Sequence, residues 1–380
     1  MAKILLKRSS DSGFSWTKTA HVAAWAGGQS GNPAPTLLAD NSTLILVFQH
    51  VTNDHHPSYA AFATRSTDDG LSFSSPVNIS AQTAGRYGSA ERWETLPSTN
   101  WWDVGPPGGV IDAQGRAVQC MNEEDPPVRD GGKPWVFSSS SADGITWLPG
   151  HRQPLSGDGS GECQIARAGM GGRRLIIFAR SQPPGTPPMG SDPNGTLEHA
   201  VLTSDDGGAH WSAPTRVTSV PGPNCEGSII GIPPADPSGQ WSLVAAAPSN
   251  TIIHDDKGGL LRAGLRMYTS QTGTDWAPLS TIDVNASAYS SLLKMPGEPT
   301  VLVMYEAGTG TSHDAPYGGL HLARRAIPGP VIPVKTDDGA HLLRLTDSRV
   351  ASQTAVAGTG LTHGGLFGKS SAWVSSLASF

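Results

Sequence analysis

Ser204-Asp-Asp206-Gly-Gly208-Ala-His-Trp211 is the stretch that decides the fold, because its pattern Ser-x-Asp-x-Gly-x-x-aromatic recurs along the chain. The copies run from Ser9 to Trp16, Ser66 to Phe73, Ser140 to Trp147, Ser204 to Trp211 and Thr269 to Trp276. In the third copy the aspartate stands at Asp143, and in the fifth Gln271 replaces it. The intervals are broadly even, and each is long enough for a four-stranded antiparallel sheet. This periodicity predicts a repeat fold.

The repeated motif has a structural interpretation. A short aspartate side chain accepts hydrogen bonds from the backbone of its own turn, and glycine supplies the positive φ that the turn requires. The aromatic residue is expected to be buried beneath the next strand. We call this motif the clasp, and we expect all clasps to lie on the outer rim of the fold, away from any ligand site.

The composition favours an all-β protein. The chain has 380 residues with 46 glycines and 31 prolines, and only 15% of its residues are charged, which suits short strands and many turns. Apolar runs of strand length recur, as in Leu44 to Phe48, Leu175 to Phe178 and Val301 to Tyr305. We expect one domain over residues 1–327, followed by a tail over residues 328–380.

Charge and cysteine content exclude several classes of function. A net charge of -6 without basic runs argues against nucleic-acid binding. No apolar stretch is long enough to span a membrane, and no signal peptide is recognised. The three cysteines have no metal-ligand spacing and are interpreted as buried thiols in a reduced compartment, which slightly favours the cytoplasm. Four glycosylation sequons favour secretion weakly, so the localisation stays open. No cofactor or metal is expected.

The clasps resemble the Asp-box, or BNR repeat, of sialidases, which are six-bladed β-propellers. Further motifs then follow in the order found in retaining exo-α-sialidases (neuraminidases): Gly161 to Ala166, Leu175 to Ser181, Asn224 to Ile230, Leu261 to Leu265, Ala288 to Leu292 and Met304 to Gly308. The resemblance covers most of residues 30 to 325. It implies a glycosidase of carbohydrate metabolism that removes terminal sialic acid, or a related nonulosonic acid, from glycans with retention of configuration.

The resemblance also implies roles for individual residues. Arg180 and Arg262 fall on two of the three arginines that bind the substrate carboxylate in this family, and Arg266 leaves the register of the second open. Guanidinium groups suit this task because they stay charged and bind a carboxylate in a bidentate fork. Glu306 would orient an arginine. Glu226 stands near the site without an assigned role.

Tyr289 is implied as the nucleophile and Glu162 as its base. A carboxylate nucleophile, usual in glycosidases, would repel the carboxylate of a sialic acid, and a tyrosine avoids this repulsion. A phenol with a pKa near 10 is a poor nucleophile at neutral pH, so a neighbouring carboxylate must take its proton. Outside this context, Tyr289 would be an ordinary strand aromatic.

The chain departs from the family pattern at its N-terminus. The family's opening strand, which carries the first arginine, and the following aspartate acid have no match before Ser9, whereas residues 31–35 match the second blade. Residues 331–343 resemble that opening strand, with Val331 at the arginine position, and could complete the first blade. Asp54 and Asp347 are the candidate acids. Otherwise both are solvated loop residues, and the tail is a flexible extension.

Two other functions remain open at this stage. A glycan-binding pseudoenzyme would keep the arginines that bind the carboxylate of sialylated glycans or free sialic acid. It would lack the acid and one arginine. A propeller enzyme acting on another acidic sugar would share only the clasps. The pair Trp101-Trp102 could stack a sugar or belong to the core, and His55-His56 and His254 to Asp256 lack metal-ligand partners.

Overall fold

The protein is an all-β fold. The computed structural model describes residues 4–23, 28–52, 59–83, 102–124, 134–155, 161–181 and 198–327. Within these residues helix is confined to two short segments, and none of the helices is long and apolar enough to cross a membrane. The elements are β1 (Ile4–Leu6), β2 (Ala20–Ala23), β3 (Gly28–Leu37), β4 (Leu44–Thr52), β5 (Tyr59–Ser66), β6 (Val77–Asn78), α1 (Ser80–Thr83), β7 (Trp102–Val104), β8 (Val110–Ile111), β9 (Ala117–Glu124), β10 (Pro134–Ser141), β11 (Leu148–Pro149), β12 (Gln153–Pro154), β13 (Cys163–Met170), β14 (Arg174–Ser181), β15 (Glu198–Ser204), β16 (Thr215–Val217), β17 (Ser228–Ile232), β18 (Gln240–Pro248), β19 (Leu265–Ser270), β20 (Ala277–Thr281), β21 (Ala286–Lys294), β22 (Thr300–Gly308), η3 (Ala315–Tyr317) and β23 (Gly319–Ala326).

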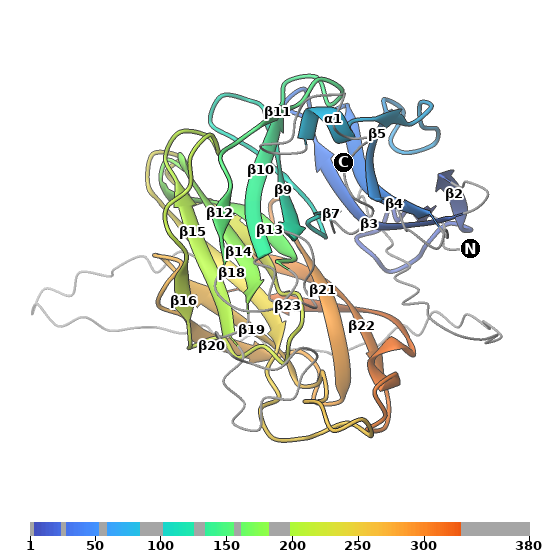
Figure 1. Ribbon diagram of the computed structural model, residues 1–380, viewed down its shortest axis with the longest axis vertical. Coiled ribbons are helices and arrows are strands. Elements are labelled where there is room, and N and C mark those ends of the chain that lie inside the picture. Colours follow the sequence, from blue (N-terminus) through green and yellow to red (C-terminus); the bar gives the residue numbers. More distant parts are fainter. Residues whose placement is uncertain are drawn as a thin grey trace, which may run out of the picture.

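The strands form antiparallel sheets in which chain neighbours pair. The first sheet is β1-β2, the second is β3-β4-β5-β6, the third holds β7 to β12, and the fifth is β21-β22-β23. The fourth sheet has eight strands, β13 to β20, and its two halves join only where Gly169 and Met170 pair with Trp241 and Gln240. The sheets follow one another around the molecule in chain order (Figure 1). Short turns between successive strands favour this arrangement.

The core lies between neighbouring sheets. Ala34, Ile45 and Val47 of the second sheet pack against Met121 and Phe137 of the third. Similar clusters join the third sheet to the fourth, the two halves of the fourth, and the fourth to the fifth. Each sheet therefore buries its faces against the sheets on either side of it.

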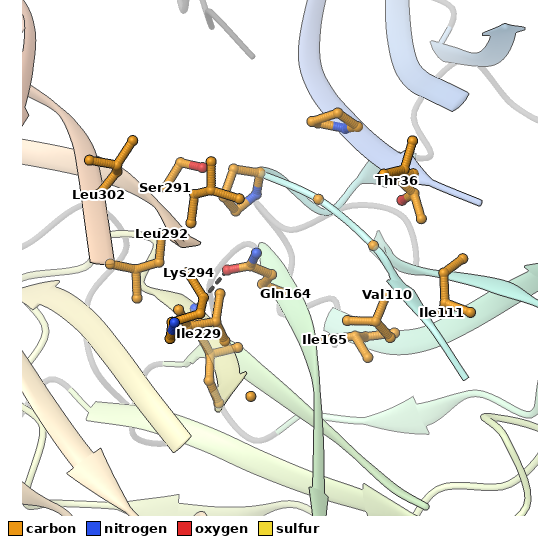
Figure 2. A pocket seen from close by; sticks show the side chains of 18 of the residues that line it. Thr36, Val110, Ile111, Gln164, Ile165, Ile229, Ser291, Leu292, Lys294 and Leu302 are labelled. Atoms are coloured by element: carbon orange, nitrogen blue, oxygen red, sulfur yellow. Dashed lines mark hydrogen bonds between the residues drawn. The ribbon is translucent and has the colours of Figure 1, made fainter. Parts of the chain in front are cut away.

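A cavity of about 490 Å³ separates the inner strands β3, β8, β13, β17 and β21, each of which contributes to its lining. Figure 2 shows Thr36 and Val110 on one side, Leu292 on the other, and Gln164 and Ile229 between them. The inner strands thus surround a common axis.

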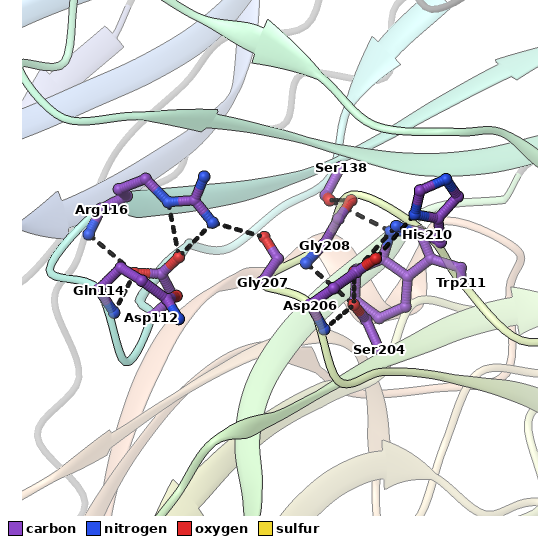
Figure 3. Close-up of polar contacts among 10 residues, drawn as sticks. All are labelled: Asp112, Gln114, Arg116, Ser138, Ser204, Asp206, Gly207, Gly208, His210 and Trp211. Carbon is purple, nitrogen blue, oxygen red and sulfur yellow. Dashed lines mark hydrogen bonds and ion pairs between the residues drawn. The ribbon is translucent and has the colours of Figure 1, made fainter.

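The clasps form the turns predicted from the sequence. In the fourth-sheet clasp, Ser204 Oγ donates to Asp206 Oδ1 at 2.8 Å and accepts the backbone N–H of Gly208, whose φ is +88° (Figure 3). Asp206 Oδ1 also accepts the backbone N–H of His210 at 3.0 Å. In the second sheet, the equivalent hydrogen bonds from the hydroxyl and backbone of Ser72 lower the pKa of Asp68 to about 2. The aspartates therefore accept hydrogen bonds within their own turns and stabilise them.

The structure corrects the register of the two weaker clasps. Ser141, not Ser140, accepts the N–H of Gly144 at 2.8 Å, and Ser270, not Thr269, accepts that of Gly273 at 2.9 Å. Both clasps are one residue shorter than the other three. In each of these shorter turns the residue three positions before the glycine, Ser141 or Ser270, has its hydroxyl next to the glycine N–H. That residue therefore accepts the bond, and Ser140 or Thr269 does not.

Four arginine side chains each donate a hydrogen bond from one sheet to the clasp of the next sheet. The acceptor is always the carbonyl of the residue before the clasp glycine. The bonds are Arg8 to Asp69 at 3.1 Å, Arg65 to Asp143 at 3.3 Å, Arg116 to Gly207 at 3.3 Å and Arg324 to Ser12 at 2.7 Å. Figure 3 shows the Arg116 bond. The last of them joins the fifth sheet to the first, so the two ends of the described chain lie side by side.

Candidate active site

The candidate site residues gather at the starting ends of inner strands. Glu162 and Glu226 stand just before β13 and β17, and Tyr289 lies near the start of β21. Arg180 lies at the end of β14, which pairs with β13, and Glu306 lies near the end of β22, which pairs with β21. Residues separated by more than 100 positions in the sequence are thereby brought together.

Tyr289, Glu162 and Arg180 form one hydrogen-bonded cluster. The Tyr289 hydroxyl donates to Glu162 Oε1. Arg180 Nη1 donates to Glu162 Oε2 at 2.5 Å and to the Tyr289 hydroxyl at 3.4 Å. All three side chains are buried, with exposed fractions between 6% and 9%. The carboxylate of Glu162 thus accepts from the phenol and is charge-balanced by the guanidinium.

Arg262 reaches the same cluster from the loop before β19. Its guanidinium carbon lies 5.5 Å from the centre of the Tyr289 ring, and it donates to the Tyr317 hydroxyl at 2.8 Å and to the carbonyl of Asn224 at 2.6 Å. Arg180 Nε donates to the side-chain oxygen of the same Asn224 at 2.7 Å. Asn224 therefore bridges the two arginines. Arg266, the alternative from the sequence, lies in β19 with an exposed side chain.

A bulge in β21 orients Tyr289. The pairing of β21 with β22 shifts register between Ser287 and Ser290, so the main chain around Tyr289 leaves the regular ladder. Two carboxyl groups accept the N–H groups there: Glu306 Oε2 accepts that of Tyr289 at 3.4 Å, and Glu226 Oε2 accepts that of Ser290 at 3.2 Å. The expectation that Glu306 orients an arginine stays a prediction.

Glu226 is the residue whose importance the sequence did not reveal. Its side chain is fully buried, and among the described residues its Oε1 atom has no hydrogen-bond partner. Burial, followed by the charges of Glu162 and Glu306, raises its pKa well above the usual value of 4.5. In the sequence, Glu226 falls in the motif Asn224 to Ile230 and was expected near the site, but without an assigned role. This raised pKa favours the neutral carboxylic acid form of Glu226, which contacts the backbone of Ser290, the residue after Tyr289.

The electrostatics suit a protonated phenol beside a charged base. Burial first, and then the charge of Glu162, raise the pKa of Tyr289 well above 10, while Arg180 and Arg262 act in the opposite direction. Burial opposes the charge of Arg180, but the Glu162 carboxylate raises its pKa above the usual value. The phenol therefore keeps its proton until a base removes it.

The expectation of three free thiols is wrong for two of them. Cys120 in β9 and Cys163 in β13 form a disulfide, with their Cα atoms 6.0 Å apart, whereas Cys225 is a buried free thiol. The two strands belong to adjacent sheets, a relationship that the 43-residue separation in sequence does not reveal. Disulfides are typical of oxidising compartments, so this bond counts against the reduced-compartment interpretation. It also ties the start of β13, next to Glu162, to the third sheet.

Other predicted residues fall partly outside the described chain. Asp54, Asp347, Trp101 and residues 328–380 lie outside it, and Trp102 opens β7. His254 bridges Leu260 within a surface hairpin, and Asp255 accepts from His313 at 3.0 Å. In the part of the chain that is described, no group of three or more His, Cys, Asp or Glu side chains could hold a metal ion.

A protein-family model places the chain among known proteins. The model of the BNR repeat-like domain matches residues 2–303, which is most of the chain. The chain therefore belongs to the BNR repeat-like domain family. No curated protein matches the sequence at a significant level.

Several solved structures with a similar fold are sialidases. The Hadza microbial sialidase Hz136 shares 20% identity with a TM-score of 0.59 over 80% of this chain and 57% of its own. Trypanosoma rangeli sialidase, solved with sialic acid, shares 16% with a TM-score of 0.56 over 80% of this chain and 47% of its own. NanB sialidase from Streptococcus pneumoniae shares 12% with a TM-score of 0.56 over 84% and 61%. The chain thus spans about half the length of the first two, and these likenesses establish the fold alone.

Proposed function

We propose that the protein is an exo-α-sialidase that hydrolyses terminal sialic acid, or a related nonulosonic acid, from glycans with retention of configuration. The observation that carries this proposal is the hydrogen bond from the Tyr289 hydroxyl to Glu162, with Arg180 on the same carboxylate and Arg262 over the phenol ring. Family membership and the sialic acid bound by the Trypanosoma rangeli enzyme support the substrate class.

The arrangement supports a two-step reaction. The two arginines would hold the substrate carboxylate through charge-assisted hydrogen bonds. The phenolic oxygen of Tyr289 would attack the anomeric carbon while its proton passes to Glu162, and the bond to the leaving glycan would break. Water would then release the sugar from tyrosine and restore the phenol. The Trypanosoma rangeli enzyme has been solved as a covalent intermediate with difluorosialic acid, which supports a covalent route here.

Protonation of the leaving group requires an acid, for which the candidates remain Asp54 and Asp347. A natural glycoside depends on this acid, whereas an activated aryl leaving group departs with little help. The comparison of 4-methylumbelliferyl sialoside with sialyllactose therefore tests its presence. A strong preference for the aryl substrate would mean that the acid is missing, and comparable rates would mean that one is present. Alanine replacement of Asp54 and Asp347 would then show which residue supplies it.

The proposed architecture is a six-bladed β-propeller. The second, third and fifth sheets would be one blade each, and the two halves of the fourth sheet one each. The first sheet, β1-β2, would contribute the outer strands of the remaining blade. The bond from Arg324 to Ser12 supports closure of the ring, because it joins the last sheet to the first clasp.

Release of 4-methylumbelliferone, measured beside calorimetric binding of free sialic acid, tests the proposal. Turnover and binding together are the expected result. Binding without turnover on any sialoside would favour the glycan-binding pseudoenzyme. Neither binding nor turnover of sialic acid derivatives, with activity on another acidic sugar, would favour the third alternative and contradict the proposal.

A further inference from the structure

The loop before β17 contacts several parts of the candidate site. We call residues 222–227 the bridging loop. Within it, the side chain and the carbonyl of Asn224 accept from the two candidate arginines. Cys225 belongs to one buried cluster with Tyr289, and Glu226 accepts a backbone N–H of the bulge in β21. A shift of this loop would therefore disturb the anion site and the candidate nucleophile together.

His199 in β15 lies behind this loop and takes no part in the proposed reaction. Its side chain has an exposed fraction of 0% and stacks on Phe178, with ring centres 4.3 Å apart. In the sheet it pairs with Arg180 of β14 and Val217 of β16. Nδ1 lies 3.3 Å from the carbonyl oxygen of Val220 and must be the donor, because a carbonyl only accepts. Nε2 has no hydrogen-bond partner among the described residues.

The imidazole ring leaves no space between itself and the bridging loop. A Cβ atom on Gly222 would lie 2.7 Å from the ring carbon Cε1 of His199, and one on Gly227 would lie 2.8 Å from Nε2. Both distances are shorter than real Cβ contacts, so glycine lets the backbone lie directly against the ring at both ends of the loop. His199 is therefore the surface against which the bridging loop packs.

We propose that His199 is a positioning residue, which holds the bridging loop in the arrangement that lets the two arginines bind one carboxylate. Through the same loop it supports the main chain after Tyr289. Because its side chain is fully buried, it acts through the loop and not by contact with a ligand. The inference deepens the proposed function and rests on it for the identity of the ligand.

The packed imidazole ring is neutral near pH 7. Burial, the largest cause, lowers the pKa of His199 to about 4, and the charge of Arg180 acts in the same direction. The carbonyls of Val220 and Cys225 oppose this shift. The titratable groups of the bridging loop are Cys225 and Glu226, and the raised pKa of each favours its neutral form. A phenyl ring should therefore replace the imidazole in this contact, whereas alanine should not.

Calorimetric titration with free sialic acid at pH 7 tests the positioning role. His199→Ala should weaken binding by about tenfold or more, whereas His199→Phe should stay within about threefold of wild type because it keeps the stacking on Phe178. Phe137→Ala is the control for loss of core packing, since Phe137 is fully buried between the second and third sheets. It should lower the Tm without changing the Kd by more than about threefold. Equal affinity in wild type and His199→Ala would overturn the inference and leave the proposed function intact.

Arginine Nε–H resonances give a second readout that needs no ligand. Arg180 Nε donates to Asn224 Oδ1 at 2.7 Å, so its signal in a proton–nitrogen correlation NMR spectrum reports the contact between the arginine and the loop. Arg180→Lys identifies this signal by removing it. His199→Ala should shift the signal and speed its exchange with water, whereas His199→Phe and Phe137→Ala should leave it close to wild type. An unchanged signal in His199→Ala would overturn the inference. Failure of wild type to bind sialic acid would contradict only the proposed function.

The pH dependence of stability tests the neutral state of the ring. Because the pKa of His199 is lowered on folding, the unfolded chain takes up a proton first as the pH falls below about 6.5, and wild type loses stability down to about pH 4. His199→Phe cannot titrate. Its Tm relative to wild type should therefore rise by about 2 °C or more between pH 7 and pH 4.5 in differential scanning calorimetry. A constant difference would mean that the ring is solvated, which would contradict the packed contact with the bridging loop.

Discussion

The backbone N–H of Ser290 donates to Glu226 Oε2 at 3.2 Å, so a fully buried carboxyl group holds the main chain directly after Tyr289. The bulge in β21 makes this contact possible, because it removes that stretch from regular pairing with β22. The position of the candidate nucleophile thus depends on Glu226, just before β17, and on Glu306 in β22. Because Glu226 contacts the backbone next to Tyr289, we expect it to act as a positioning residue.

Glu226→Gln should preserve the site, because the glutamine oxygen can accept the same N–H and a neutral carboxyl is already the favoured state. We expect kcat within about threefold of wild type, whereas Glu226→Ala should lose more than about tenfold in kcat with little change in KM. The raised pKa means that wild type loses stability as the pH rises from about 4.5 towards the pKa of the folded state. The glutamine variant does not titrate. Its Tm relative to wild type should therefore rise between pH 5 and pH 9, and an opposite trend would mean that Glu226 is ionised.

Tyr289→Phe should abolish turnover while free sialic acid still binds. The phenolic oxygen forms a bond to the sugar only during the reaction, so we expect a loss of at least about 10³-fold in kcat and a Kd within about threefold. Tyr305→Phe is the matched control, since Tyr305 lies in β22 and donates to Asp283 at 3.2 Å, outside the cluster. Turnover near wild type in Tyr289→Phe would assign the nucleophile elsewhere.

Arg180→Lys should weaken sialic acid binding by about tenfold or more in isothermal calorimetry. A lysine has no planar fork and cannot keep the bonds to Glu162 and Asn224 while binding a carboxylate. Arg174→Lys is the control on the same strand, because Arg174 forms an exposed ion pair with Asp205. Unchanged affinity in Arg180→Lys would remove Arg180 from the anion site.

Reduction of the disulfide should destabilise the protein. Loss of the Cys120–Cys163 bond, which closes a separation of 43 residues, is expected to lower the Tm by about 3–8 °C in differential scanning calorimetry with dithiothreitol. The double variant Cys120→Ala/Cys163→Ala should have the lower Tm from the start and show no further response. If dithiothreitol shifts both proteins equally, its effect does not come from this bond.

The sequence predicted the contacts that depend on local pattern. The all-β class and the clasps follow from turn chemistry, and Ser204 and Asp206 make the hydrogen bonds expected of them. The register of the weaker clasps was wrong by one residue, because Ser140 and Ser141 are equally plausible without the position of the glycine N–H. The family resemblance predicted that Tyr289, Glu162, Arg180 and Arg262 share one site.

Contacts between sheets could not be predicted in this way. The disulfide joins strands of adjacent sheets, and nothing in the spacing of Cys120 and Cys163 distinguishes this pair from one with Cys225. Asn224 accepts from Arg180 through its side chain and from Arg262 through its backbone carbonyl. This role depends on the position of the loop that carries Asn224, which the sequence pattern does not give. The raised pKa of Glu226 results mainly from its complete burial. Its position just before a strand does not predict that burial.

The arginine bonds between sheets are compatible with clasps of different sequence. Each accepting atom is a main-chain oxygen, and the residues that provide it are Ser12, Asp69, Asp143 and Gly207. Because every amino acid carries that oxygen, the bond itself requires no particular side chain, although the positive φ of Ser12, Asp69 and Gly207 restricts which residues fit. The joint therefore depends on the shape of the backbone and not on a side-chain acceptor. Copies of the motif can therefore drift until they are barely recognisable in sequence while the joint between neighbouring repeats is retained.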